Sequence, residues 1–127
     1  VDDNELNRDV AKFMLEDNGI KVEEAENGQE AVDKFWASKI GYYDAILMDI
    51  MMPGLNGWEA TEKIRAMKRW DAERVSIIAL SANSFADDIV SSKLAGMDMH
   101  LSKPLDEKKL LETIKQCLSK HMNDKKL

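Results

Sequence analysis

Two short runs of consecutive apolar residues, Ile46-Leu47-Met48 and Ile77-Ile78-Ala79-Leu80, limit most strongly what this chain can fold into. Neither run alternates with polar residues, so each is expected to be a strand of a parallel sheet that helices cover on both faces. Amphipathic stretches separate these runs, which is the pattern of βαβ units. The sequence therefore predicts a doubly wound α/β domain, with strands at Lys21–Ala25, Ala45–Met48, Val75–Leu80 and Met99–Leu101.

Polar residues mark where the intervening helices begin. A capping residue stands three positions before a carboxylate at Asn27 and Glu30, at Asn56 and Glu59, and at Ser84 and Asp87. Such a pair satisfies exposed N–H groups in the first turn of a helix. The last helix is expected to begin at Asp106, because a stripe of apolar residues recurs after it at helical spacing: Leu110, Leu111, Ile114, Cys117 and Leu118.

The beginning of the chain departs from this pattern, because only Val1 stands before the acidic pair that should follow a first strand. In the doubly wound strand order 2-1-3-4-5 the first strand is central, so a shortened one leaves a gap in the sheet. We therefore predict one flavodoxin-like domain over residues 1–127, with a five-stranded parallel sheet whose first strand is truncated.

Composition excludes several classes of function. The net charge of −6 and the pI near 4.9 argue against a nucleic-acid surface, which needs a basic footprint. The single cysteine, Cys117, allows no internal disulfide. No apolar run is long enough to span a bilayer, so we expect no direct membrane contact. The expected location is the cytoplasm, or the cytoplasmic part of a larger protein.

Polar residues follow the predicted strands at the ends where ligands of open α/β sheets bind. Asp2 and Asp3 follow the first strand, and Asp49, Ser81 and Lys103 follow the later ones. Each residue alone is typical of a turn or a helix cap, but their joint placement at successive strand ends is not.

This set of groups suits phosphoryl transfer. Clustered carboxylates repel each other unless a cation joins them, and Mg²⁺ prefers hard oxygen ligands. An aspartate can act as the nucleophile that accepts a phosphoryl group, while a lysine and a cation neutralise the developing charge.

The chain resembles the receiver (response-regulator) domain family of two-component signalling. The stretches that carry the resemblance cover almost the whole chain: Val1-Asp2-Asp3-Asn4, Tyr43 through Pro53, Asn56-Gly57, Ala79-Leu80-Ser81-Ala82 and Leu101-Ser102-Lys103-Pro104.

The resemblance implies an active site built on these residues. Asp49 is expected to be the phosphoacceptor. Asp3 is expected to bind Mg²⁺, or Mn²⁺ in its place, directly, and Asp2 to bind it through water. The backbone carbonyl of Met51 would complete the metal ligands.

The resemblance also implies a conformational switch. Ser81 matches the switch hydroxyl that approaches the phosphoryl group, and Lys103 matches the lysine that contacts it, with a cis bond to Pro104. His100 occupies the position of the aromatic switch residue, where Tyr or Phe is commoner. The face made of the fourth helix, fifth strand and fifth helix, over residues 85–96 and 99–118, is expected to change on phosphorylation.

Within the family, residues 77–105 look most like the receivers of hybrid sensor histidine kinases. The implied partners are a histidine kinase or a histidine phosphotransfer domain that approaches Asp49 near the first helix. The resemblance also implies that two copies of the domain can form a phosphorylation-dependent dimer. The expected role is a signalling switch rather than an enzyme, with no nucleic acid bound by this domain.

Three alternatives remain at this point. An aspartate-based Mg²⁺-dependent phosphatase would want a second acid two residues after the nucleophile, where Met51 stands. A flavin-binding module would want a hydroxyl- and glycine-rich phosphate cradle. A degenerate receiver, used only as an interaction scaffold, would not need the complete set of acidic, hydroxyl and lysine residues. The chain has no G-x-x-x-x-G-K-[ST] motif for ATP, so the phosphoryl group is expected to come from another molecule.

Overall fold

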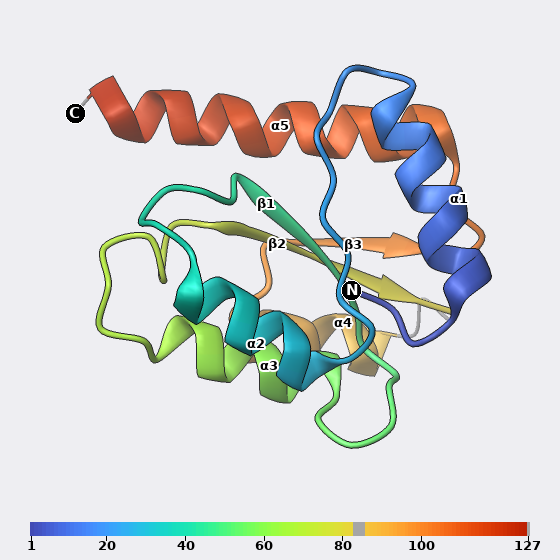
Figure 1. The fold of residues 1–127 in the computed structure, drawn as a ribbon, viewed down its shortest axis with the longest axis horizontal. Coiled ribbons are helices and arrows are strands. Elements are labelled where there is room, and N and C mark those ends of the chain that lie inside the picture. Colours follow the sequence, from blue (N-terminus) through green and yellow to red (C-terminus); the bar gives the residue numbers. More distant parts are fainter. Residues whose placement is uncertain (83–85, 127) are drawn as a thin grey trace.

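The structure is a three-layer α/β arrangement. The computed structural model describes residues 1–82 and 86–126. A parallel sheet with strand order β1-β2-β3 lies in the middle, with α1 and α5 on one face and α2 and α3 on the other, and α4 beside α3 (Figure 1). The elements are α1 (Glu5–Glu16), α2 (Gly28–Ala37), β1 (Ala45–Asp49), α3 (Gly57–Arg65), β2 (Ser76–Ser81), α4 (Ala86–Ala95), β3 (Met99–Ser102) and α5 (Glu107–Lys126).

The strands pack apolar residues on both faces, as the uninterrupted apolar runs predict. Met48 and Ile77 face α2 and α3, where they join Phe35 in one buried cluster. Ile78 faces the opposite side and packs against Leu110 of α5. Full burial of each such side chain stabilises the fold by about 1.5–3 kcal/mol. The helices on both faces are therefore held by the central strands.

Helix starts lie where the capping pairs predict them. The side chains of Asn27 and Asn56 each accept a hydrogen bond from the backbone N–H three residues on, at 2.7 and 2.9 Å. Asn4 does the same for α1 at 3.0 Å, so α1 begins directly after the acidic pair. The N-cap expected at Ser84 lies outside the described residues. Within the described part of the chain, none of the helices has the length and apolarity that crossing a bilayer requires.

The prediction of a strand at Lys21–Ala25 is wrong for this structure, which has three strands in its described residues. A strand needs a neighbouring strand bonded to it through the backbone, and among the described residues this segment has one such backbone bond, from the Asp2 N–H to the Ala25 carbonyl at 3.2 Å. Val1, next to Asp2, pairs with β1 instead. The Val1 amino group donates to the Leu47 carbonyl at 2.6 Å, and the Val1 carbonyl accepts from the Asp49 N–H at 3.0 Å. The order segment 21–25, Val1, β1, β2, β3 therefore follows the predicted 2-1-3-4-5 arrangement.

The strands end close to where the apolar runs predict. β1 and β2 each continue one residue further than expected, so Asp49 and Ser81 are the last residues of their strands. The sheet hydrogen bonds therefore fix the backbone of both residues, and their side chains project from a rigid element rather than from a loop.

Candidate functional site

Three carboxylates meet at the carboxyl end of the sheet. Oxygen atoms of Asp2, Asp3 and Asp49 all lie within 4.8 Å of one another. Asp2 and Asp49 are 5% and 4% exposed, whereas Asp3 is exposed to solvent. The structure thus brings Asp49 to an adjacent acidic pair that lies 46 or more positions before it in the sequence, and one member of that pair is open to solvent.

Backbone contacts hold the acidic pair in place. The Asn4 N–H donates to Asp2 Oδ1 at 2.9 Å, and the Arg8 guanidinium donates to the Asp2 carbonyl at 2.8 Å. Because Val1 pairs with β1 and Asn4 caps α1, the two residues between them are fixed at the mouth of the site.

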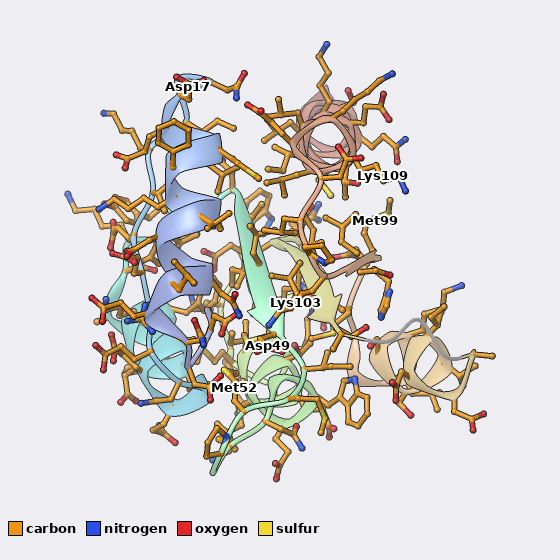
Figure 2. The ribbon with its side chains drawn as sticks, turned by 90° about the vertical axis from the view of Figure 1, so that its right-hand side faces the viewer. Asp17, Asp49, Met52, Met99, Lys103 and Lys109 are labelled. Carbon is orange, nitrogen blue, oxygen red and sulfur yellow. The ribbon has the colours of Figure 1, made fainter. Side chains whose placement is uncertain are left out.

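Lys103 connects the first and third of these acidic positions. Its Nζ donates to Asp2 Oδ2 at 2.9 Å and to Asp49 Oδ2 at 3.0 Å, and Figure 2 shows it beside Asp49 at the end of β1. The Lys103 N–H donates to the Ser81 carbonyl at 2.7 Å, which anchors the lysine to the end of β2. The Lys103–Pro104 bond is cis, as the family resemblance implies.

Burial and the lysine act in opposite directions on the two buried carboxylates. Burial raises the pKa of Asp2, but the hydrogen bonds from Lys103 and from the Asn4 N–H outweigh it, so the pKa lies below its ordinary value. At Asp49, burial is the stronger effect, and the pKa lies above its ordinary value despite the bonds from Lys103 and the Met51 N–H. Burial lowers the pKa of Lys103, but its bonds to the two carboxylates raise it more.

The loop after β1 folds back onto Asp49. The Met51 N–H donates to Asp49 Oδ1 at 3.1 Å, while the Met51 side chain is 70% exposed. Gly57 lies against this turn: a Cβ there would stand 2.3 Å from the Asp49 carbonyl oxygen and 2.7 Å from the Ile50 Cα. No side chain fits at that distance, so the glycine lets α3 begin in contact with the backbone of Asp49. The metal-binding role of the Met51 carbonyl stays a prediction.

Ser81 and His100 are in direct contact. Ser81 is 2% exposed, and its Oγ lies 3.1 Å from His100 Nε2. In the β2/β3 ladder His100 pairs with Ala79, and Ser81 pairs with Ser102, so the two side chains are diagonal neighbours on one face of the sheet. The predicted switch pair therefore forms one hydrogen-bonded unit.

The donor set fits a hard divalent cation. Three carboxylates converge and one ammonium faces them, which leaves the cluster negative by about two charges. Carboxylate oxygens with an open, solvated side are the ligands that Mg²⁺ prefers, because it keeps several of its waters. The acidic cluster can therefore hold a metal ion.

Residues 1–115 match the family model described as the response regulator receiver domain. The chain belongs to this family of two-component signalling domains. Among curated relatives, this receiver is 40% identical over 118 residues to the sensor protein GacS of Pseudomonas syringae pv. syringae, which covers 90% of this chain and 12% of GacS. It is 38% identical over 117 residues to hybrid signal transduction histidine kinase L of Dictyostelium discoideum, covering 91% of this chain and 7% of that kinase. The receiver therefore spans only a small part of the length of the relatives it matches.

Solved receiver structures share the fold. The receiver domain of sensor histidine kinase PA1611 from Pseudomonas aeruginosa PAO1 has a TM-score of 0.84 and 36% identity, covering 94% of this chain and 93% of that one. That structure has a magnesium ion coordinated in the active site cleft. Chemotaxis protein CheY4 of Vibrio cholerae has a TM-score of 0.83 and 27% identity, covering 91% of this chain and 92% of that one.

Sequence reasoning identified every residue of this cluster but missed two contacts. It assigned Lys103 to the phosphoryl group alone, whereas the lysine also bonds Asp2. It also missed the bond between Ser81 and His100. Residues two apart in a strand share a face, so Ser81 lies on the face of Ala79, and His100 on the face of Ser102. Sequence could have shown that Ser81 and His100 are neighbours only if the register of β2 and β3 had been known.

Proposed function

We propose that this receiver accepts a phosphoryl group on Asp49 from a phosphohistidine of a partner protein. The observation that carries the proposal is the Lys103 Nζ bonded to both Asp2 and Asp49 at the carboxyl end of a parallel sheet. Phosphoryl transfer depends on positioning and on neutralised charge more than on covalent chemistry, and this arrangement supplies both.

The transfer balances as a single displacement. An oxygen of the Asp49 carboxylate forms a bond to phosphorus while the P–N bond of the phosphohistidine breaks, and the leaving imidazole keeps that electron pair and takes a proton from solvent. Lys103 then exchanges part of its bond to the carboxylate for one to the phosphoryl oxygens, and Ser81 can donate its hydroxyl to another of them. The product is an acyl phosphate on Asp49.

Asp3, Asp49 and the Met51 carbonyl are the groups proposed to hold Mg²⁺, with Asp2 acting through water. When bound, the ion would offset the charge that gathers on the phosphoryl oxygens. The exposed position of Asp3 and the buried position of Asp49 support this division, because the ion then meets solvent on one side only.

The test uses intact mass after incubation with a small phosphodonor and Mg²⁺. We expect one added phosphate in the wild-type chain and none in Asp49→Asn, which keeps the shape of the side chain and loses the nucleophile. An equal rate of phosphate gain in that variant would refute the assignment. A wild-type chain that stays unmodified would favour a scaffold role instead.

The proposed docking surface for the phosphohistidine partner is a stripe on α1. Leu6, Val10 and Phe13 recur at helical spacing and are 70%, 41% and 72% exposed, respectively; Leu6 and Val10 also border a cavity between α1 and β1, whereas Phe13 does not. Because α1 starts directly after the acidic pair, a helix that packs on this stripe would lie beside Asp49. We propose that a helical histidine phosphotransfer domain, or the histidine-bearing helices of a kinase, occupies it.

A pair of variants separates docking from chemistry. Phe13→Ser should slow phosphotransfer from a phosphorylated histidine phosphotransfer protein while leaving the rate with a small phosphodonor unchanged. Leu94→Ser serves as the control, because Leu94 is 84% exposed but lies on α4. Equal effects of the two substitutions on phosphotransfer would count against α1 as the docking helix.

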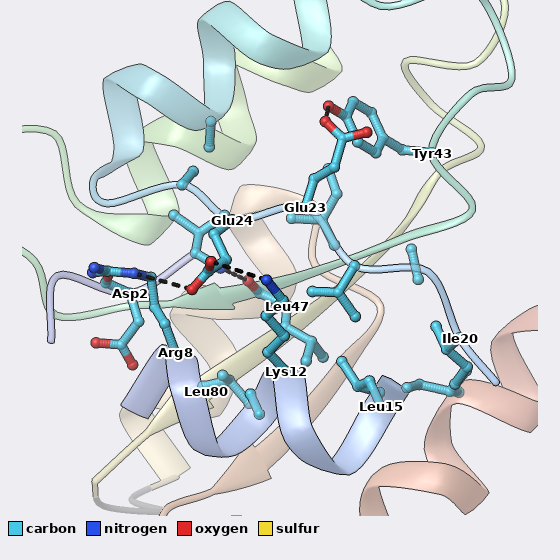
Figure 3. A pocket seen from close by; sticks show the side chains of 18 of the residues that line it. Asp2, Arg8, Lys12, Leu15, Ile20, Glu23, Glu24, Tyr43, Leu47 and Leu80 are labelled. Carbon is cyan, nitrogen blue, oxygen red and sulfur yellow. Dashed lines mark hydrogen bonds and ion pairs between the residues drawn. The ribbon is translucent and has the colours of Figure 1, made fainter. Parts of the chain in front are cut away.

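We also propose that a fourth parallel strand completes the sheet in a cavity between α1 and β1. The cavity has a volume of about 820 Å³ and is lined mainly by apolar side chains, several of which Figure 3 labels, including Leu15, Ile20 and Leu47. Packed interiors contain few voids larger than a water molecule, so a space of this size at the centre of an α/β sheet calls for an occupant.

The backbone pattern supports a strand rather than a small ligand. Val1 and Asp2 already bridge β1 and segment 21–25 at one end of the cavity. Alternate residues of an extended chain point their N–H and C=O groups to the same side. Ala45 would therefore offer both groups to this space, and Leu47 its N–H, since the Leu47 carbonyl already accepts from Val1. Lys21 and Glu23 would face the same space from the other side. An apolar strand leading into Val1 would pair with both edges.

The proposed output is a change at α4, β3 and α5. A phosphoryl group adds charge and strong acceptors at Asp49, which favours packings in which Ser81 approaches it. Hydrogen-exchange mapping with and without beryllofluoride and Mg²⁺ would test this. If the mimic binds and residues 86–118 do not change, only a phosphate-carrying role remains.

A further inference from the structure

The hydrogen bond between Ser81 and His100 raises the question of which atom carries the proton between them. The two atoms, Ser81 Oγ and His100 Nε2, are 3.1 Å apart, and the hydroxyl is buried. A serine hydroxyl has one proton to donate and two lone pairs to accept with. A neutral imidazole has one N–H and one bare nitrogen, so the direction of this bond depends on its tautomer.

The two directions have opposite consequences for the site. If Nε2 is bare and accepts, the single hydroxyl proton points at His100, and a phosphoryl group must break that bond before Ser81 can donate to it. If Nε2 carries the hydrogen and donates, the bond to His100 does not use the hydroxyl proton, which can turn toward the phosphoryl oxygen while the bond to His100 persists.

The charge at this end of the sheet favours donation from His100. Three carboxylates face one ammonium here, so the local potential is negative. A negative potential draws the hydroxyl proton toward the cluster and leaves the Oγ lone pairs facing the imidazole, where an N–H can bond them. In a chain of hydrogen bonds that runs toward a negative charge, each bond polarises and strengthens the next.

We propose that His100 is a positioning residue that donates from Nε2 to the Ser81 hydroxyl and so aims the hydroxyl proton at a phosphoryl oxygen on Asp49. The inference rests on the proposed function of Asp49. It makes the imidazole and the hydroxyl one moving unit: when Ser81 approaches the phosphoryl group, His100 follows through the bond rather than by filling a vacated space.

Beryllofluoride at saturating Mg²⁺ is the probe, and the dissociation constant is the readout. His100→Phe keeps a ring and loses the donor, so the mimic should bind about fivefold more weakly, in keeping with the loss of one hydrogen bond. His100→Gln keeps an N–H donor and should stay within about twofold of wild type. In a Ser81→Ala background His100→Phe should have no further effect, because the hydroxyl that it positions is gone.

Each other outcome overturns the proposal. Tighter binding in His100→Phe would mean that the imidazole competes for the hydroxyl proton. Equal weakening in the Ser81→Ala background would mean that His100 contributes packing only.

A second measurement does not depend on phosphoryl chemistry. With His121→Gln leaving one histidine, ¹⁵N-resolved spectra of the unliganded chain report which ring nitrogen carries hydrogen. We expect hydrogen on Nε2, and a bare Nε2 would overturn the proposal. If wild type binds no beryllofluoride, the proposed function of Asp49 fails, while this spectrum still decides the direction of the bond.

Discussion

Replacing Lys103 with methionine should turn the bonded cluster into a pair of uncompensated buried charges. Lys103 Nζ lies 2.9 Å from Asp2 Oδ2 and 3.0 Å from Asp49 Oδ2, and the three side chains are 22%, 6% and 5% exposed. Removing one partner of a fully buried ion pair costs about 3–5 kcal/mol. Because the lysine is partly exposed, we expect the lower end, about 3 kcal/mol, at pH 7 without divalent cations.

Urea unfolding in EDTA measures this loss, which corresponds to a lower midpoint by about 1.5 M for a chain of this size. Lys109→Met is the control, because Lys109 is an exposed lysine on α5. The control should shift the free energy of unfolding by no more than about 0.5 kcal/mol.

The pH dependence gives the sharper test. In wild type the pKa of Asp2 is lowered, so the stability it contributes is present above its unfolded pKa and is lost as pH falls through the folded pKa. In Lys103→Met burial is the largest remaining effect on both carboxyls, opposed by the N–H groups of Asn4 and Met51 that still donate to Asp2 and Asp49. We expect burial to raise the pKa of both carboxyls, so the variant gains stability as pH falls from 7 through those raised values. The difference in free energy of unfolding between wild type and Lys103→Met should therefore become smaller toward pH 4. It should also become smaller when millimolar Mg²⁺ replaces the missing ammonium. A gap that stays constant across pH and Mg²⁺ would refute this electrostatic account.

Three further predictions concern the metal, the acceptor turn and the cavity. Asp3→Asn should weaken Mg²⁺ binding about tenfold or more by fluorescence titration, while Asp9→Asn, which alters an exposed carboxylate on α1, should not. Equal affinities of the two variants would remove Asp3 from the site. Gly57→Ala should lower stability and also impair beryllofluoride binding, because the new Cβ would stand 2.3 Å from the Asp49 carbonyl oxygen. Gly28→Ala, whose Cβ would stand 2.4 Å from the Leu55 carbonyl oxygen, should lower stability only. Normal beryllofluoride binding in Gly57→Ala would show that the acceptor turn tolerates the shift. A five-residue valine-rich extension before Val1 should slow amide exchange in segment 21–25 about a hundredfold or more relative to a Gly-Ser extension of equal length, since a strand in the cavity would pair with that segment; identical exchange in the two proteins would exclude a strand there.

The sequence predicts β1 and β2 to within one residue because each contains a continuous apolar run, and burial on both faces leaves no other period to choose. The shorter β3, in which His100 separates Met99 from Leu101, is also predicted to within one residue. The helix starts at Asn27 and Asn56 follow from local chemistry as well, since a cap and its partner lie in the same turn. The prediction fails at Lys21–Ala25 for a physical reason. Whether an extended segment becomes a strand depends on its neighbour, which local sequence does not contain.

The candidate site divides in the same way. Strand ends converge in any parallel sheet, so the gathering of Asp2, Asp3, Asp49 and Lys103 follows from topology. Which atoms meet depends on register and rotamer. That is why the second bond of Lys103 and the contact of Ser81 with His100 appear only in three dimensions. The catalytic and metal-binding roles of these residues stay predictions that the experiments above test.

The bond from Lys103 to Asp2 joins residues 101 positions apart in the chain. Contacts of such long range form late in folding, because most of the intervening chain must first be ordered. During synthesis, every nascent chain that has not yet reached residue 103 carries Asp49 without its lysine, and domains of this size fold as units once they have emerged. On the proposed role of Asp49, a chain that has not yet reached residue 103 would accept a phosphoryl group poorly, so phosphorylation would mark domains whose synthesis has passed Lys103.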